Sequence, residues 1–183
     1  MNPHITPLIE CLMRTPSSIS DKELEQCGFL LSMLVEKHSK QRTPGSFYEE
    51  VLPKPYFDIE LDESEYREIV SKLCHLLNSP VASIKSKDMI LFALAGTDSR
   101  TLMLSIPALV QFLGHSIGQP IFEDCTKCLA RLLSSPQKVR EQAPQIRQAL
   151  PNLGEVFQLI SKRVGQGSDA SVALERLQNL LAD

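Results

Sequence analysis

Leucine and other apolar residues recur three and four positions apart along most of this chain, the spacing that places side chains on one face of an α-helix. Segments in which apolar and polar residues alternate, as in a half-buried strand, are scarce. Proline, glycine and serine interrupt the pattern repeatedly, so it predicts many short to medium helices and an all-α fold. We expect helices at about 7–13, 21–38, 62–78, 81–95, 98–104, 106–115, 119–134, 137–149, 152–164 and 168–182.

Polar residues that cap helices mark several of these boundaries. Ser20 or Asp21 precedes the second helix, and Asp62 is followed three positions later by Glu65, the spacing of a capping box. Ser168 follows two glycines at the break before the last helix, where we expect it to act as the cap.

An irregular segment interrupts the helices at residues 39–62, where the prolines predict that no helix persists. It contains four of the chain's ten aromatic residues, Phe47, Tyr48, Tyr56 and Phe57, among prolines and acidic residues. A disordered linker is usually poor in aromatic residues. Two hypotheses follow: the rings pack on the neighbouring helices, or the segment presents them to a partner protein as a docking element.

A short motif recurs at the ends of helices, in which two adjacent apolar residues are followed three positions later by proline. Its copies are Ile9, Leu12, Met13 and Pro16; Leu73, Leu76, Leu77 and Pro80; and Leu129, Leu132, Leu133 and Pro136, with a partial copy at Leu177, Leu180 and Leu181. Helices joined by such short turns bury their apolar faces by stacking on their neighbours, as in repeat proteins.

Residues 106–116, Ile-Pro-Ala-Leu-Val-Gln-Phe-Leu-Gly-His-Ser, resemble the second helix of an armadillo repeat, whose pattern is Ile-Pro-x-Leu-Val-x-Leu-Leu followed by small residues. The next helix and the last helix are similar to the third armadillo helix. The matching positions are Ile121, Cys125, Cys128, Leu129, Arg131 and Leu132 in the first of them, and Ala173, Leu177, Asn179 and Leu180 in the second. The chain thus resembles armadillo and HEAT helical repeats, most clearly over 97–134 and 152–182.

The resemblance implies an armadillo/HEAT-like right-handed superhelical stack of short helices. The irregular Pro-rich, acidic-aromatic insert at 39–62 has no place in a regular repeat. We therefore expect an N-terminal helical pair at 1–38, this insert and armadillo-like repeats at 63–183, within a single continuous domain. In the family, an Asn of the third helix lines a groove and hydrogen-bonds the backbone of an extended peptide. Arg131 and Asn179 occupy that position here. Together with Lys127 and Gln178 they are the candidate partner-binding residues, and an Arg favours an acidic group in the ligand.

Charge is distributed unevenly along the chain. The formal net charge of −3 argues against a dedicated nucleic-acid-binding protein. Eight acidic and two basic residues lie between Phe47 and Glu68, whereas seven basic and two acidic residues lie between Lys127 and Val164. Each region is either a solvated surface or one side of an electrostatic contact, in which the basic region attracts an acidic peptide from a partner or from the insert.

Composition places the chain among ordinary globular proteins, with 43% apolar and 22% charged residues. The longest apolar run, 89–96, is too short to cross a bilayer, and the first residues lack the pattern of a secretory signal. Five cysteines, an odd number, favour a reducing compartment. We therefore expect an intracellular protein of the cytoplasm or nucleus that does not bind membranes.

Cys125 and Cys128 have the spacing of a redox pair or of half a zinc site. A redox pair needs an exposed helix N-terminus after a strand, and a zinc site needs two more ligands, of which His115 alone is near in sequence. Both cysteines fall where a helix is expected to pack on its neighbour, which favours a packing role. Neither Gly-x-Ser-x-Gly nor His-Glu-x-x-His occurs. We predict no enzymatic activity, no cofactor, no bound metal and no small-molecule substrate.

These observations predict a protein-interaction scaffold that binds a peptide or helix of a partner, with acidic character, in a groove lined by third-type helices. Two alternatives stay open. One is a small metal-binding regulator that uses Cys125, Cys128 and His115. The other is a fragment or short isoform of a larger armadillo-like scaffold, for which a meiotic scaffold is one guess. In that case we expect the leucines of the last helix to be partly uncovered.

Overall fold

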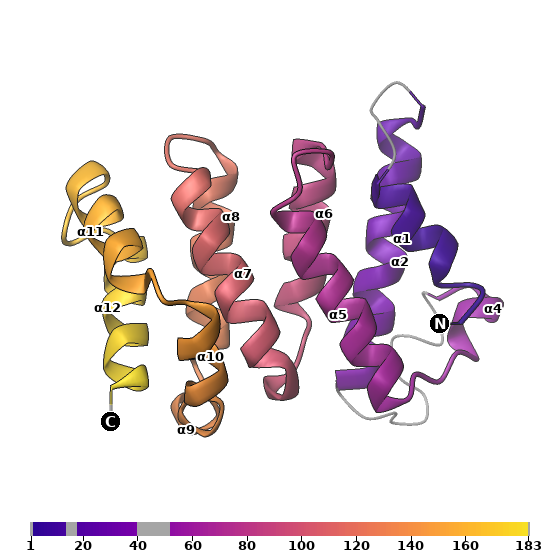
Figure 1. Ribbon diagram of the computed structural model, residues 1–183. Coiled ribbons are helices and arrows are strands. Elements are labelled where there is room, and N and C mark those ends of the chain that lie inside the picture. Colours follow the sequence, from indigo (N-terminus) through magenta and orange to yellow (C-terminus); the bar gives the residue numbers. More distant parts are fainter. Residues whose placement is uncertain (1, 14–17, 40–51, 183) are drawn as a thin grey trace. The chain divides into compact units, whose positions relative to one another are not determined.

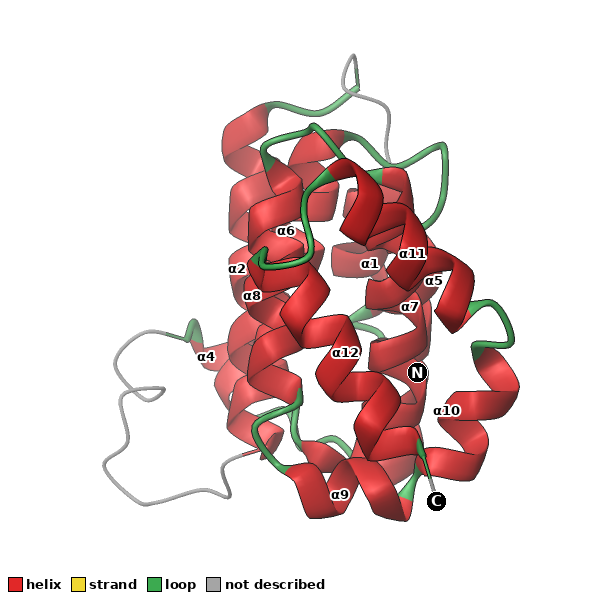
Figure 2. Cartoon of the chain, turned by 90° about the vertical axis from the view of Figure 1, so that its left-hand side faces the viewer, coloured by secondary structure: helices red, strands yellow, loops and turns green. Residues whose placement is uncertain are grey.

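The structure is a computed structural model that describes residues 2–13, 18–39 and 52–182. These residues are 75% helical and contain no strand, as Figure 2 shows, which confirms the predicted all-α class. The chain divides into two compact units, Met1–Asp98 and Ser99–Asp183. Within the described ranges no single helix is long and apolar enough to cross a membrane. One bent pair of helices, Ile84–Ala95 with Ser99–His115, passes that test when the two are taken together.

Helical hairpins build the first unit. Its described helices are α1 (Thr6–Met13), α2 (Asp21–Ser39), α4 (Lys54–Phe57), α5 (Glu63–Leu77) and α6 (Ile84–Ala95). Helices α1 and α2 form one hairpin, and α5 and α6 form the next (Figure 1). Helix α1 contacts α5 and α2 contacts α6, so the first helices of the two hairpins form one layer and the second helices form another.

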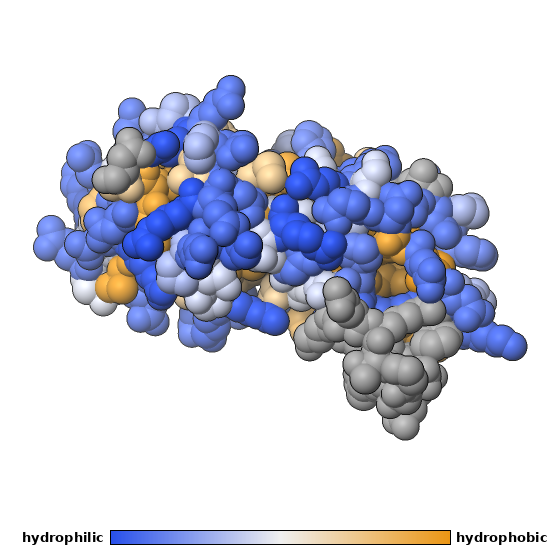
Figure 3. Space-filling view, turned by 90° about the horizontal axis from the view of Figure 1, so that it is seen from below, coloured by the Kyte–Doolittle hydropathy of each residue, from blue (hydrophilic) through white to orange (hydrophobic). Residues whose placement is uncertain are grey.

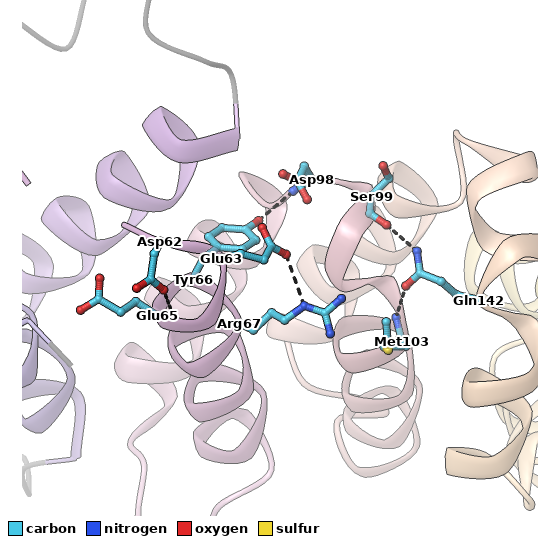
Figure 4. A network of polar contacts seen from close by, with 9 residues as sticks. All are labelled: Asp62, Glu63, Glu65, Tyr66, Arg67, Asp98, Ser99, Met103 and Gln142. Carbon is cyan, nitrogen blue, oxygen red and sulfur yellow. Dashed lines mark hydrogen bonds and ion pairs between the residues drawn. The ribbon is translucent and has the colours of Figure 1, made fainter. Parts of the chain in front are cut away.

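Side-chain caps fix the starts of these helices where the sequence predicts them. At the start of α2, the Ser20 amide donates to Glu23 Oε2 (3.0 Å) and the Glu23 amide donates to Ser20 Oγ (3.3 Å), a reciprocal capping box. Before α5, Asp62 Oδ1 accepts from the Glu65 amide at 2.8 Å (Figure 4). These bonds satisfy backbone donors that a helix start leaves without intrahelical partners.

A close approach joins α2 to α6 at Gly28. A Cβ atom added at Gly28 would lie 2.5 Å from the Cβ of Met89 and 2.7 Å from its Cγ. No larger residue fits here unless one of the two helices shifts, so the hydrogen side chain of glycine sets the distance between the two helices.

Buried polar groups secure the ends of the first unit. The ring of Tyr66 is fully buried and lies 4.4 Å from the ring of His38, centroid to centroid. Its hydroxyl accepts a hydrogen bond from the amide of Asp98 at 3.1 Å (Figure 4). The ammonium of Lys37, also buried, donates to the carbonyl of Ile59 at 2.9 Å. These bonds hold the segment before α5 and the turn after α6 against the helices.

The Pro-rich segment corrects one prediction. No helix was expected to persist between 39 and 62, yet α4 forms a single turn inside it. Pro53 is the N-cap residue of α4 and Pro55 lies in its first turn. Proline is tolerated there because a first-turn amide has no intrahelical acceptor to lose.

The second unit is also built from helical hairpins. It contains the 3₁₀ turn η1 (Ser99–Thr101) and the helices α7 (Leu102–His115), α8 (Ile121–Leu132), α9 (Pro136–Glu141), α10 (Ala143–Ala149), α11 (Leu153–Arg163) and α12 (Asp169–Leu181). Helix α7 packs on α8 and α11, and α12 packs on α11 and α8 (Figure 1). Helices α9 and α10 connect the two hairpins and contact α12.

Two proline positions explain where the helices of this unit differ from the predicted ones. The expected helices at 98–104 and 106–115 are largely one helix, α7, which contains Pro107. Helix α7 is mostly buried, so packing offsets the one hydrogen bond that Pro107 cannot make. The expected helix at 137–149 is divided at Gln142, because Pro144 lacks an amide hydrogen and its ring would clash with the carbonyl of Arg140 in a continuous helix.

Gln142 occupies this break and ties it to the start of α7. Its Oε1 accepts from the amide of Met103 at 3.0 Å, and its Nε2 donates to the carbonyl of Ser99 at 2.5 Å (Figure 4). One side chain thus satisfies an amide in the first turn of α7 and a carbonyl of η1.

The leucines of the last helix are buried, contrary to the expectation under the fragment hypothesis. Leu177, Leu180 and Leu181 are each at most 6% exposed, because α12 packs them against its neighbours in the unit.

Candidate functional site

A groove of about 490 Å³ lies between α8 and α12 in the second unit. Its apolar wall is formed by side chains of both helices and of the turns that adjoin them. These are Phe122, Ala130, Leu133, Val164, Val172 and Ala173. Val172 is 51% exposed, which is high for a valine beside a buried helix face.

The sequences of α8 and α12 create this groove. Each helix buries one apolar face, which includes Cys125 and Leu129 in α8 and Leu174 and Leu177 in α12. The groove runs along the borders of these faces, where several side chains are small. Alanine at 130, 170 and 173 leaves space that larger side chains would fill.

Charged residues lie at defined places along the groove. Glu123 and Asp169 belong to the first turns of α8 and α12, and Arg176 lies two turns further along α12. Lys127 Nζ is 3.0 Å from Glu123 Oε1, and this hydrogen-bonded carboxylate raises the pKa of Lys127. Arg176, which is exposed, forms no ion pair with any residue that the structure describes. Its guanidinium is therefore available to a ligand.

The sequence-predicted binding residues fall both inside and beside this groove. Lys127 lines it, whereas Arg131 lies one turn further along α8 and is exposed. Near the end of α12, Gln178 is half-buried and Asn179 is exposed, and neither lines the groove. Sequence reasoning missed Arg176; the sequence shows that it lies four residues after Val172 and so on the same helix face, but not which residues of α8 that face meets.

Burial governs the chemistry of the Cys125–Cys128 pair. The Sγ of Cys125 lies 3.4 Å from the carbonyl of Leu109 in α7, as expected of a packing residue. Burial raises the pKa of Cys125 well above its ordinary value and that of Cys128 to about 12, so both are thiols at neutral pH. His115 is exposed, and in the described part of the chain no three His, Cys, Asp or Glu residues form a group that could hold a metal ion.

Of the insert's aromatic residues, Tyr56 alone has a described side chain. It is half-buried and meets the ring of His4 edge to face, with centroids 6.3 Å apart. Phe47, Tyr48 and the side chain of Phe57 lie outside the described residues.

Comparison with known proteins assigns no relative to the chain. No family model matches it, and no match was found among curated proteins or solved structures.

Proposed function

We propose that this chain is a non-enzymatic protein-interaction scaffold of the armadillo/HEAT-like kind, in which the groove between α8 and α12 binds a helix or peptide of a partner protein. The proposal rests on one observation, namely which two helices line the groove. The two helices whose sequences resemble the third armadillo helix are the two that line it. Grooves between such helices are where repeat scaffolds hold their ligands.

The packing in each unit supports the repeat interpretation. In both units two helical hairpins pack with first helix on first helix and second helix on second helix. This is the unit from which helical-repeat stacks grow, and we propose that the whole chain follows a right-handed superhelix of this kind. None of the five cysteines, all of which the structure describes, forms a disulfide, which supports our expectation of a reducing compartment, the cytoplasm or nucleus.

The groove also defines the ligand we expect. Its small apolar wall accepts aliphatic side chains, which gain free energy as they leave water. Arg176 within the groove, and Arg131 beside it, favour a carboxylate on the ligand through charge-assisted hydrogen bonds. Gln178 and Asn179 lie outside the groove near the end of α12, where their amide groups can pair with the backbone of a peptide that extends along this helix. We therefore propose an acidic amphipathic segment as the ligand.

Affinity capture from cell extract, quantified for each variant, tests this function. We expect Val172→Asp, and the double variant Lys127→Glu with Arg131→Glu, to reduce recovery of a partner about tenfold or more. Glu175→Gln, on an exposed part of α12 outside the groove, should retain the partner and serves as the matched control. If both groove variants recover the same proteins in the same amounts as the parent chain, this assignment of the groove is wrong.

A further inference from the structure

A second groove, of about 550 Å³, lies in the first unit between α2 and α6. Six side chains line it: Lys22, Glu25, Gln26, Phe29, Met89 and Phe92. Like the groove between α8 and α12, it lies between the second helices of two neighbouring hairpins. All six residues belong to the first unit, so the groove is a separate surface from the one discussed above.

Two phenylalanines make this surface unusual. Phe29 is 38% exposed and Phe92 is 51% exposed, although α2 and α6 already pack closely through Gly28 and Met89. Val81 and Ile84, just before α6 and at its start, are also exposed. The face seen from below in Figure 3 is mostly hydrophilic, with apolar side chains gathered in a few places. Exposed apolar side chains that line a groove, as Phe29 and Phe92 do, are typical of sites that bind another protein.

Of the two charged residues that line the groove, Glu25 is paired with a lysine of α6 and Lys22 is not paired with any residue that the structure describes. Glu25 Oε1 lies 2.5 Å from Lys85 Nζ on α6, so this carboxylate is already paired. The hydrogen-bonded Glu25 carboxylate raises the pKa of Lys85, with smaller contributions from Asp88 and Asp21, which do not line the groove. Lys22 is exposed and forms no ion pair within the described ranges. It precedes Phe29 by two helical turns, a distance of about 10 Å along α2.

We propose that this groove binds an amphipathic helix of a partner protein. The helix inserts an apolar side chain between Phe29 and Phe92, over Met89, and places a carboxylate beside Lys22. A helix is the fitting ligand because residues seven positions apart lie on one face and are separated by the same two turns as Phe29 and Lys22. The apolar contacts with Phe29 and Phe92 at one end of the groove give the affinity. Lys22 at the other end selects a ligand helix that carries an acidic residue there.

Fluorescence anisotropy with labelled helical peptides and the full chain tests the proposal. The first peptide carries leucines in one helical turn and a glutamate seven positions before them. The second carries the glutamate seven positions after the leucines. Both are needed because a helix can lie in a groove in either direction. Each has a counterpart with lysine in place of glutamate. We expect one glutamate peptide to bind about fivefold more tightly than its lysine counterpart at low salt.

Two variants locate this binding. Lys22→Glu should reverse the preference so that the lysine peptide binds more tightly, and Phe92→Ser should weaken both peptides about tenfold. Glu175→Gln, on an exposed part of α12 outside both grooves, should change neither affinity and serves as the control. Arg176→Glu separates the two proposals: peptide binding that falls with Arg176→Glu but not with Lys22→Glu or Phe92→Ser belongs to the groove between α8 and α12, which contradicts the present proposal and leaves the proposed function standing.

Three outcomes would overturn the proposal. The first is equal affinity for glutamate and lysine peptides in both directions. The second is unchanged binding by Phe92→Ser. The third is a concentration-dependent dimer in sedimentation that Phe92→Ser abolishes, because that result would assign the groove to a second copy of the chain.

Discussion

The residue at position 28 controls the packing of the first unit, since even one added methyl group would collide with Met89. We predict that Gly28→Ala lowers the free energy of unfolding by about 1–3 kcal/mol, because the overlap outweighs alanine's better helix propensity. Gly154 in α11 has no neighbour within 4 Å of an added Cβ, so Gly154→Ala should instead raise stability by up to about 1 kcal/mol. Urea unfolding followed by far-ultraviolet circular dichroism measures both. Equal effects of the two substitutions would contradict the steric explanation.

The buried thiols of α8 make stability depend on pH. The pKa values of Cys125 and Cys128 are raised by burial, so folding favours the protonated thiols. Their contribution is fully present below the unfolded pKa of about 8.5 and is lost as pH rises toward the folded value, about 12 for Cys128. We predict that the free energy of unfolding falls in this range by up to about 1.4 kcal/mol per pH unit for each thiol.

Urea midpoints between neutral and alkaline pH test this dependence. The double variant Cys125→Ala with Cys128→Ala is less stable at neutral pH, but its stability should fall less steeply as pH rises. Parallel pH profiles for the parent and the variant would show that the thiols do not titrate on unfolding.

Among the elements, the junction of α9 and α10 has the most consequence for stability, because Gln142 connects it to η1 and α7. We predict that Gln142→Ala lowers the free energy of unfolding by about 1–3 kcal/mol, since it leaves two backbone groups without their partner. Gln145→Ala, at an exposed position three residues away, should change stability by less than about 0.5 kcal/mol. Thermal unfolding of the two variants compares them directly.

Local sequence patterns were enough to predict most of the helices but not every break between them. The caps at Ser20 and Asp62 act on amides three residues away, so a local pattern identifies them. The continuity of α7 through Pro107 depends instead on burial by helices distant in sequence. The split at Gln142 was predictable from Pro144 alone, and the sequence interpretation overlooked that signal.

On the scale of the whole molecule, the chain consists of two units that each bury their own core. We predict that residues 99–183 fold when expressed alone, with helical circular dichroism and cooperative unfolding. A fragment of residues 102–183 should be less stable, because it lacks the Ser99 carbonyl that Gln142 binds. An unstructured 99–183 fragment would show that this unit depends on the first one.

The groove between α8 and α12 shows how far sequence reasoning reaches for a site. The resemblance indicated the two helices that line it, but the residues it carried over, Arg131 and Asn179, lie outside the groove; of the other two candidates, Lys127 lines it and Gln178 does not. It did not select Val172 or Arg176, because a groove depends on which side chains of two helices face each other. Helices separated by some forty residues give no local signal of that pairing.

The position of Gln142 also determines the order in which parts of the chain can fold while it is being synthesised. A ribosome completes α7 well before it reaches residue 142, so the amide of Met103 and the carbonyl of Ser99 gain this partner only when the α9–α10 junction has emerged. The first unit differs, since the Tyr66 hydroxyl is already present when Asp98 is added. The first unit is therefore able to complete its contacts while the nascent second unit still lacks the residue that secures its opening helix.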